Sequence, residues 1–573
     1  MPIRPIVTAT SRKLRTFVMF VGYTVLAGGS YAQSPSNLKT LARQSLAKID
    51  GQLNAAGLQK PVEVIRDKWG IPHIYAQNVD DLFFAQGYVM AQDRLWQMEW
   101  WRREREGRLA EILGSAAVER DRQTRLTKFR GPFDEREWTS YHPEAKRLVS
   151  AYVNGINAYI AGNSDNLPVE FKLTGIRPDT WTPETVLLRA NERALADAAS
   201  ELRLARSVAR LGVAEANRLA APDPWDDLQI PAGLDVKIVG EEVLRSVSTS
   251  GSRALPKPEI VEPYRGLFRT IASAWMPFDL IREPGSNNWV LSGKMTTTGK
   301  PVVANDPHRE VTNPSLRYIV HLNAPGWNVI GASEAPFIGV HIGHNAKLGW
   351  GMTVVGTDQV DVLVEEVNPA NANEVLYKGK WEPLRIAREE IKIKGEAPRQ
   401  VELKFSRHGA VIHQDTEHKR AYVLRSVTDE PGTAWYLASL RLAQATDCRA
   451  FLDAAMYWKA PSENLICGDV DGNISWQASA LTPSRIGWFG RLPVPGTGDY
   501  EWQGFRQDLP HEFNPERGFI ATANHNIQPK GYSPPLMFKN PQAAERITRI
   551  LQVIKPGKKF SIEDHKNLQH TCI

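Results

Sequence analysis

Ser286 is the main candidate catalytic residue of this sequence. It follows a glycine and stands in the segment Gly285-Ser286-Asn287-Asn288-Trp289. A serine hydroxyl is a potential nucleophile, but it needs an adjacent base before it attacks an amide. A Gly-Ser pair beside a turn is commonplace, so an ordinary loop serine is the competing interpretation.

The sequence motifs of several other reaction classes are incomplete in this chain. The nearest approach to a Gly-x-Ser-x-Gly turn, around Ser333, lacks the last glycine. Segment 293–301 has one residue too many for a phosphate-binding loop, and Pro301 stands where such a loop has Ser or Thr. His341 and His344 lack a His-Glu-x-x-His pattern, so they either stabilise a turn or belong to a metal-dependent amidase.

Five blocks, taken together in chain order, resemble one known family. They are 285–289, Asn305-Asp306-Pro307-His308, Gly343-His344-Asn345, 492–498 and Ala523-Asn524-His525-Asn526. From about Val62 onward the chain resembles the penicillin acylase family of N-terminal-nucleophile hydrolases. The resemblance implies an α+β fold, a four-layer αββα sandwich with a helical smaller subunit.

The resemblance also implies that the chain cuts itself between Gly285 and Ser286. The Ser286 hydroxyl would attack the preceding carbonyl, which it can approach because glycine has no side chain. The freed α-amino group has a reference pKa of about 7.7 to 8.0, so it can serve as the base at neutral pH, through a bound water. The product would be an α/β heterodimer that hydrolyses linear N-acyl amides of small molecules.

Further site residues are implied by their places in the family blocks. The backbone N–H of Val354 and the side chain of Asn526 would stabilise the oxyanion, His308 would lie beside the nucleophile, and Arg546 would support the site. Taken singly, each has a simpler interpretation: a core strand residue, a turn residue, a loop residue and a solvated helix charge.

A calcium site is a weaker implication of the same resemblance. The carboxylates of Glu201, Asp358 and Asp361 and the carbonyl of Val360 match family ligand positions and are oxygen donors suited to calcium. A further family carboxylate falls on Leu536 and Met537, which cannot supply it. The alternative is a surface cluster of acids. No organic cofactor is expected.

The acyl pocket departs from that of the benzylpenicillin enzymes. Its places fall on Asn191, Leu195, Arg309 and Ile342 instead of aromatic and Met side chains. Arg309 would pair with an acidic substrate group or point away. Because His308 resembles the arrangement in cephalosporin and acyl-homoserine-lactone acylases, an acyl-homoserine-lactone acylase is an alternative to a penicillin acylase. An inactive truncated family member is a second alternative, because family members continue beyond the point that matches Ile573.

The elements that must position these residues change along the chain. Alternation around Lys68-Trp69-Gly70 predicts a hairpin over 60–77, a helical stripe follows from Asn78 or Asp80 to Gly114, and 143–220 is mostly helical. After residue 286 short alternating runs predict strands, among them 288–291, 302–304, 360–367 and 401–405. Helices followed by strands favour a mixed fold with an antiparallel sheet.

Changes in composition along the chain indicate where its segments begin and end. Residues 1–32 carry basic residues, an apolar run and Ser30-Tyr31-Ala32, which predicts a signal peptide and a secreted, periplasmic protein. An uncleaved membrane anchor is the alternative. The resemblance implies that residues 33–225 form the small subunit and that 286–573 form a large subunit truncated after Ile573, with the Pro-, Ser- and Gly-rich residues 226–285 as a spacer between them.

Composition bounds the remaining possibilities. With 573 residues, 42% of them hydrophobic, the chain can bury a large core. Its formal charge of +6 falls to +2 without the four basic residues of 1–32, so no nucleic-acid partner is expected, and no membrane association after signal removal. Cys448 and Cys467 are able to pair, or to remain buried thiols.

Overall fold

The computed structural model describes residues 35–189, 192–220, 228–248, 285–309, 312–529, 532, 536 and 544–571. The predicted signal peptide 1–32, most of the predicted spacer, Asn191 and Met537 lie outside this part of the chain. None of the helices within it is long and apolar enough to cross a membrane.

Helices dominate the chain before residue 250, as the sequence pattern predicts. They are α1 (Pro35–Gln44), α2 (Val79–Glu106), α3 (Ala110–Leu113), α4 (Val118–Thr127), α5 (Glu135–Tyr141), α6 (Ala145–Gly162), α7 (Val169–Thr174), α8 (Pro183–Val186), α9 (Glu192–Leu211), α10 (Val213–Ala220) and α11 (Glu241–Ser248). Four more follow among the strands, α13 (Ser439–Leu442), α14 (Cys448–Ala455), α15 (Glu545–Val553) and α16 (Ile562–Thr571).

Strands from two regions of the chain form three sheets in the described residues. The first has the order β1 (Glu63–Arg66), β2 (Pro72–Tyr75), β5 (Arg317–Ala324), β6 (Trp327–Glu334), β7 (Ile342–Asn345), β8 (Leu348–Val354), β16 (Glu463–Asp469), β17 (Ile474–Ser479) and β19 (His511–Phe513). The second has the order β11 (Lys380–Pro383), β10 (Asn371–Tyr377), β9 (Val360–Asn368), β15 (Arg420–Ser426), β14 (Ala410–Asp415), β13 (Arg399–Phe405) and β12 (Arg385–Ile391), and β18 (Val494–Pro495) pairs with β9. The third is β20 (Phe519–Thr522), β3 (Ser286–Leu291) and β4 (Val302–Pro307).

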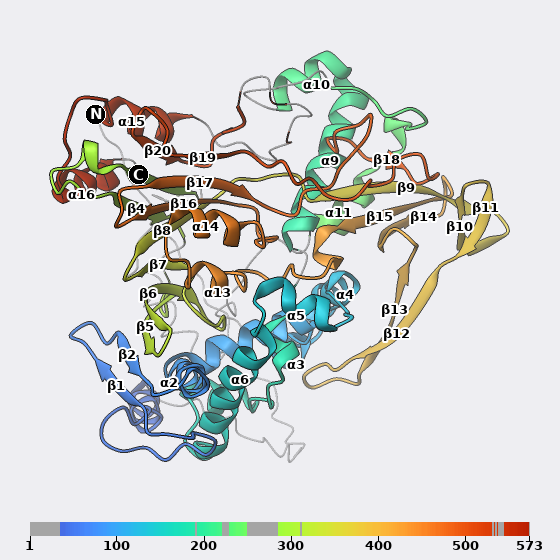
Figure 1. The fold of residues 1–573 in the computed structure, drawn as a ribbon. Helices are drawn as coiled ribbons and strands as arrows, with labels where there is room; N and C mark the ends of the chain where they lie inside the picture. The colour runs from blue at the N-terminus through green and yellow to red at the C-terminus, as the bar shows by residue number, and fades with distance from the viewer. Residues whose placement is uncertain are drawn as a thin grey trace, which may run out of the picture.

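The mixed α+β class is therefore confirmed. In the view of Figure 1, α2, α4, α5 and α6 lie below the strands, whereas α9 and α10 lie above β9. Among the described residues, the pairings β2–β5 and β9–β18 are parallel and the other strand pairings are antiparallel. The predicted hairpin over 60–77 is β1–β2, in which Val64 pairs with Ile74. The predicted strands 288–291, 302–304, 360–367 and 401–405 lie within β3, β4, β9 and β13.

The helical region is built around the crossing of α2 and α6. A Cβ placed on Gly87 would lie 1.9 Å from the Tyr152 carbonyl oxygen, and one on Gly155 would lie 1.9 Å from the Phe84 carbonyl oxygen. Only glycine therefore allows the two backbones to approach this closely. The helix predicted to run to Gly114 ends earlier, because Gly107 adopts a left-handed φ of 68° and closes α2 at Glu106.

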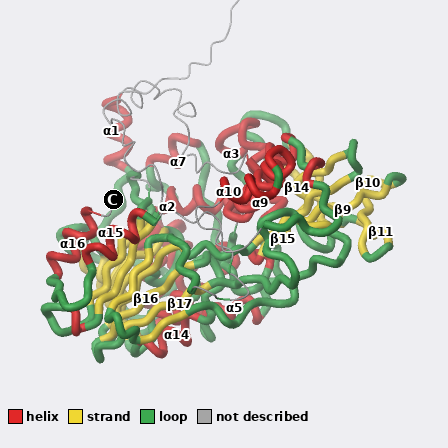
Figure 2. Tube along the Cα trace, turned by 90° about the horizontal axis from the view of Figure 1, so that it is seen from above, coloured by secondary structure: helices red, strands yellow, loops and turns green. Residues whose placement is uncertain are grey.

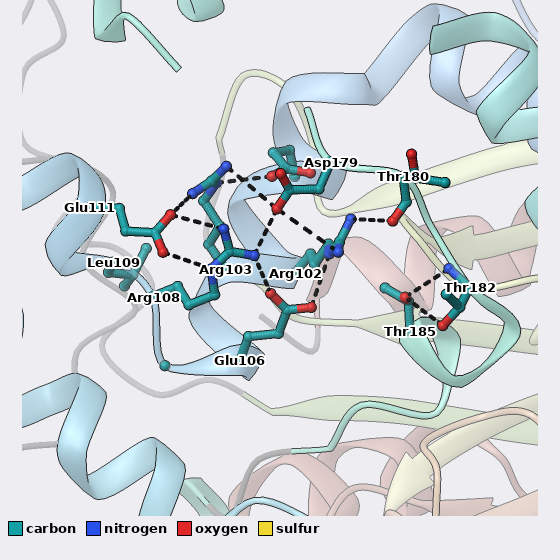
Figure 3. A network of polar contacts seen from close by, with 12 residues as sticks. Arg102, Arg103, Glu106, Arg108, Leu109, Glu111, Asp179, Thr180, Thr182 and Thr185 are labelled. Atoms are coloured by element: carbon teal, nitrogen blue, oxygen red, sulfur yellow. Dashed lines mark hydrogen bonds and ion pairs between the residues drawn. The ribbon is translucent and has the colours of Figure 1, made fainter. Parts of the chain in front are cut away.

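A network of ion pairs fixes the end of α2 (Figure 3). The Arg108 guanidinium lies 2.7 Å from Asp179 and 2.8 Å from Glu111, and Arg103 contacts Glu111 as well as Glu99, at 2.9 Å for the latter. Burial raises the pKa of Glu99 to about 7, against the influence of Arg103. These contacts join α2 to the loop that precedes α8.

Part of the predicted spacer is ordered structure. Within 228–248 lies α11, whose Val243 and Val247 are buried in one core cluster with Leu202 of α9. Residues 241–248 of the predicted spacer 226–285 therefore form a helix that packs on α9, and the spacer itself stays a prediction. Cys448 and Cys467 are joined by a disulfide that links α14 to β16.

Candidate active site

The candidate active site lies at the first residue of the three-stranded sheet. Ser286 begins β3 and is 3% exposed, and its backbone pairs with Pro307 at the end of β4. In Figure 1, α15 lies beside β20 and α16 beside β4, the two neighbours of β3. Figure 2 shows α15 and α16 together along the strands at one end of the molecule. Every residue of β3 is buried, so the nucleophile predicted from the sequence stands on a strand fixed on both sides.

The Ser286 hydroxyl faces the peptide bond that it is predicted to cut. Its Oγ donates a hydrogen bond to the Gly285 carbonyl oxygen at 2.7 Å. The same oxygen accepts a hydrogen bond from the backbone N–H of His308 at 2.8 Å. This second contact follows from the sheet register, because Ser286 pairs with Pro307 and places the next residue of the β4 chain beside Gly285. The carbonyl therefore already has a donor where negative charge would develop.

Asn524 holds the nitrogen of the nucleophile. Its Oδ1 accepts a hydrogen bond from the Ser286 N–H at 2.6 Å, and its Nδ2 donates to the Val354 carbonyl oxygen at 2.9 Å. Asn524 itself has a left-handed φ of 62°, a conformation that Asn tolerates better than most residues. The nitrogen that would become an α-amine is thus fixed by an acceptor.

Arg546 of α15 reaches the same group of atoms. Its Nη1 donates to the Ser286 carbonyl oxygen at 2.8 Å and to Asn287 Oδ1 at 2.7 Å, and its Nη2 donates to Asn524 Oδ1 at 3.1 Å. The structure brings this predicted residue to the nucleophile, although 260 residues separate the two in sequence. A guanidinium there adds positive charge close to the future amine.

The position of Val354 is set by alternation along β8. Val355 donates its N–H to Ser462, toward β16, whereas the Val354 carbonyl is turned toward Asn524. Adjacent residues of a strand direct their peptide groups to opposite sides. The N–H of Val354 therefore also faces away from β16, on the side of Asn524.

His308 lies at the site through its backbone, and its ring belongs to a small polar group beside it. His308 Nε2 is 3.1 Å from Asp306 Oδ2 and 3.4 Å from Asn287 Nδ2. Asn305, from the same predicted block, donates from Nδ2 to the backbone oxygens of Asn287 and Met352 at 3.1 and 3.0 Å. The block 305–308 thus connects β4 with β3 and β8.

Asn526, the side-chain oxyanion donor implied by the resemblance, lies in a turn of its own. Its Oδ1 accepts a hydrogen bond from the Gln528 N–H at 3.2 Å. The structure places Asn524 rather than Asn526 against Ser286. The register of β20 with β3 explains this position. Thr522 pairs with Asn288, so continuing the antiparallel register by two residues places Asn524 opposite Ser286.

Three of the four residues proposed for the acyl pocket lie in the described part of the chain. Leu195 is buried in the core between α9 and the second sheet, and Ile342 packs against the other large core cluster. Arg309 is largely buried beside Tyr436. Burial opposes its charge, but Tyr436, Glu334 and Glu463 outweigh burial and raise the pKa of the guanidinium. Asn191 lies outside the described residues.

His341 and His344, the histidines of the alternative metal-dependent amidase, lie in different surroundings. His341 is fully buried and stacks on Tyr436, and burial holds its pKa well below the usual value, whereas His344 is exposed and lies near the Asn345 carbonyl. No cluster of three His, Cys, Asp or Glu side chains placed to hold a metal occurs in the described part of the chain.

The predicted calcium ligands lie close together, but they surround the side chain of Arg485.

Comparison with known proteins identifies relatives along most of the chain. A model of the penicillin amidase family matches residues 61–571. Penicillin acylase 2 proenzyme of Pseudomonas sp. (strain SE83) is 31% identical over 527 residues, covering 91% of this chain and 65% of that protein. Acyl-homoserine lactone acylase QuiP of Pseudomonas aeruginosa is 30% identical over 528 residues, covering 88% of this chain and 60% of that protein.

Two further relatives complete the comparison. Penicillin G acylase of Escherichia coli is 27% identical over 544 residues, covering 88% of this chain and 64% of that protein. The chain thus spans between 60% and 65% of the length of these three curated relatives. The solved structure of a thermostable penicillin G acylase from Alcaligenes faecalis aligns with 50% of this chain and 52% of its own, at 26% identity and a TM-score of 0.46.

Proposed function

Because this chain belongs to the penicillin amidase family, we propose that it is an N-terminal-nucleophile amidohydrolase. It cuts its own backbone between Gly285 and Ser286 and then hydrolyses N-acyl amide bonds. The observation that carries the proposal is the Ser286 hydroxyl hydrogen-bonded to the Gly285 carbonyl at 2.7 Å, with the His308 N–H on the same oxygen.

Self-cleavage would proceed by an acyl shift from nitrogen to oxygen. Ser286 Oγ attacks the Gly285 carbonyl carbon, and the developing oxyanion is held by the His308 N–H. The bond from Gly285 carbon to Ser286 nitrogen breaks as that nitrogen takes the hydroxyl proton, which leaves an ester. Water then hydrolyses the ester, leaving a carboxyl group on Gly285 and a free α-amine and hydroxyl on Ser286.

Turnover of a substrate would use the two groups set free on Ser286. The α-amine, held by Asn524, takes the hydroxyl proton, directly or through a water, while Oγ attacks the substrate carbonyl. We assign oxyanion stabilisation to the Val354 N–H and to Asn524 rather than Asn526, because Asn524 contacts both Ser286 and Val354. The amine product leaves first, and water releases the acyl group.

The acyl group of the substrate is proposed to be uncharged. Arg309, one of the residues implied for the acyl pocket, already interacts with the carboxylates of Glu334 and Glu463 and with the Tyr436 hydroxyl. An acidic acyl chain would have to compete with these groups. Penicillin acylase is the first candidate activity, and acyl-homoserine-lactone acylase is the second, because relatives of both kinds match at 31% and 30% identity.

Hydrolysis assays separate the candidates. The purified chain is incubated with benzylpenicillin and with a long-chain acyl-homoserine lactone, and the released 6-aminopenicillanic acid or homoserine lactone is measured. Loss of release in Ser286→Ala, with full release in EDTA, supports the serine mechanism and argues against a metal amidase at His341 and His344. Hydrolysis that persists in Ser286→Ala would refute it, and an intact chain without activity would indicate an inactive family member.

Three further expectations belong to the same proposal. The core is a four-layer αββα sandwich, and cleavage yields a small subunit from 33–225 and a large subunit from 286–573. The chain is secreted to the periplasm, where loss of 1–32 would leave Gln33 at the amino terminus. A periplasmic fraction whose small subunit starts at another residue, or a cytoplasmic chain starting at Met1, would contradict the signal peptide.

A further inference from the structure

Four oxygen-bearing residues from distant parts of the chain meet beside β9. Glu201 comes from α9, Asp358 from the loop before β9, and Val360 and Asp361 from the start of β9 itself. Their exposed fractions are 1% for each carboxylate residue and 2% for Val360. The sequence resemblance assigns these residues to calcium, so the structure tests whether a metal ion fits them.

Arg485 occupies the centre of this group. Its Nε lies 2.9 Å from Asp361 Oδ2, and its Nη2 lies 3.1 Å from the Val360 carbonyl oxygen and 3.4 Å from Asp358 Oδ1. The Arg485 side chain is only 7% exposed. One guanidinium thus contacts three of the four predicted calcium ligands. Burial opposes its charge, but the two aspartates outweigh burial and raise its pKa.

Other N–H groups also bind the carboxylate oxygens. Trp502 Nε1 donates to Asp361 Oδ2 at 2.6 Å, and Val362 N–H donates to Glu201 Oε2 at 3.0 Å. Calcium requires six to eight oxygen ligands at about 2.3 to 2.6 Å, and an N–H group cannot be one of them. The residues present therefore do not fit a calcium ion as they are arranged.

The surrounding loop is shaped to seat the guanidinium. Gly490 has a left-handed φ of 74°, and a Cβ at this position would lie 2.4 Å from Asp358 Oδ2 and 2.9 Å from Arg485 Cζ. Only glycine leaves room for this contact. The Trp488 ring lies 5.3 Å from Arg485 Cζ, which is within the range of a cation–π contact.

We propose that Arg485 is the built-in cation of this cluster and replaces a calcium ion, so that this chain holds α9 on β9 without metal. The proposal concerns folding and is independent of the proposed hydrolase activity. It follows that removing the guanidinium deprives these buried carboxylates of the positive charge of Arg485, and that a divalent cation can then take its place.

Thermal unfolding of the full chain tests this proposal. The wild type is expected to melt at the same temperature in excess EDTA and in millimolar CaCl₂, with no calcium found by elemental analysis. Arg485→Ala is expected to melt at least about 5 °C lower in EDTA, because breaking a buried ion pair exposes an uncompensated charge, and CaCl₂ is expected to restore part of the loss. Arg388→Ala, at an exposed pair with Glu402, is the matched control and should not respond.

Three results would overturn the proposal. A wild-type melting temperature that falls in EDTA and returns with calcium would show that the native cluster holds a metal. An Arg485→Ala protein as stable as the wild type would show that the guanidinium does not hold the cluster, and one that calcium does not stabilise would show that these oxygens form no cation position. If Arg485→Ala yields no folded protein, the EDTA response and calcium content of the wild type decide.

Discussion

Replacement of Arg546 tests how the site tunes its base. The guanidinium is bonded to Asn524 Oδ1 at 3.1 Å, and that oxygen holds the Ser286 nitrogen at 2.6 Å. These two contacts put the guanidinium nitrogen and the Ser286 nitrogen at most about 6 Å apart, a separation at which two unit charges repel by about 2.8 kcal/mol at an effective dielectric of about 20. This corresponds to a depression of the amine pKa by up to about 2 units.

Arg546→Met is therefore expected to raise the pKa of the amine. The base must be neutral to accept a proton, so a higher pKa moves the acidic limb of the pH–rate profile to higher pH. A rise of about 1 unit, allowing for solvent screening, lowers kcat/KM roughly tenfold at pH values below the pKa of the wild-type amine, and by less at neutral pH. The assay is kcat/KM of the processed chain from about pH 5 to pH 9, with the faster of the two candidate substrates.

Arg546→Lys is the matched control. It keeps the charge and loses the paired hydrogen bonds to Ser286 and Asn287, so the rate should fall while the acidic limb stays in place. An Arg546→Met profile that is lower but has an unshifted limb would refute the electrostatic role and leave Arg546 as a purely structural support.

The remaining predictions concern the segment 524–526. Asn524→Ala should lower self-cleavage and turnover on the order of 100-fold, as loss of an oxyanion-hole side chain does, whereas Asn526→Ala, which removes a bond to Gln528, should change them a few-fold at most. Equal effects in rate assays would contradict the assignment to Asn524. Burial, aided by Arg546, lowers the folded-state pKa of His525 to about 4 from 6.5, so its contribution to stability is present above pH 6.5 and is lost as pH falls toward 4. Urea unfolding should show His525→Gln losing about 2 kcal/mol less than the wild type between about pH 7.5 and pH 5, and equal losses would contradict this.

Local periodicity predicted most elements that surround the site. The β1–β2 hairpin and the strand that begins at Ser286 follow from alternation and turn residues over fewer than twenty positions. α11 was missed because its apolar positions, Val243 and Val247, lie in a short segment with the composition of a spacer. The helix is completed only by burial against α9, which no local pattern contains.

The composition of the candidate site could be predicted only in part. Family blocks led to Ser286, His308 and Arg546, and the structure brings all three together. The choice between Asn524 and Asn526 depended on the register of β20 with β3, which spacing alone does not specify. Arg485 has no local signal at all, because its partner Asp361 is 124 residues away.

Mapping the amino terminus of the large fragment tests the central claim most directly. The full-length chain and Ser286→Ala are purified under identical conditions and examined by intact-mass analysis and amino-terminal sequencing. The wild type is expected to give a fragment that starts Ser-Asn-Asn-Trp, while Ser286→Ala remains joined through residues 285 and 286. A folded wild-type chain that stays uncut at this bond, or an Ser286→Ala chain cut there at the wild-type rate, would contradict the account.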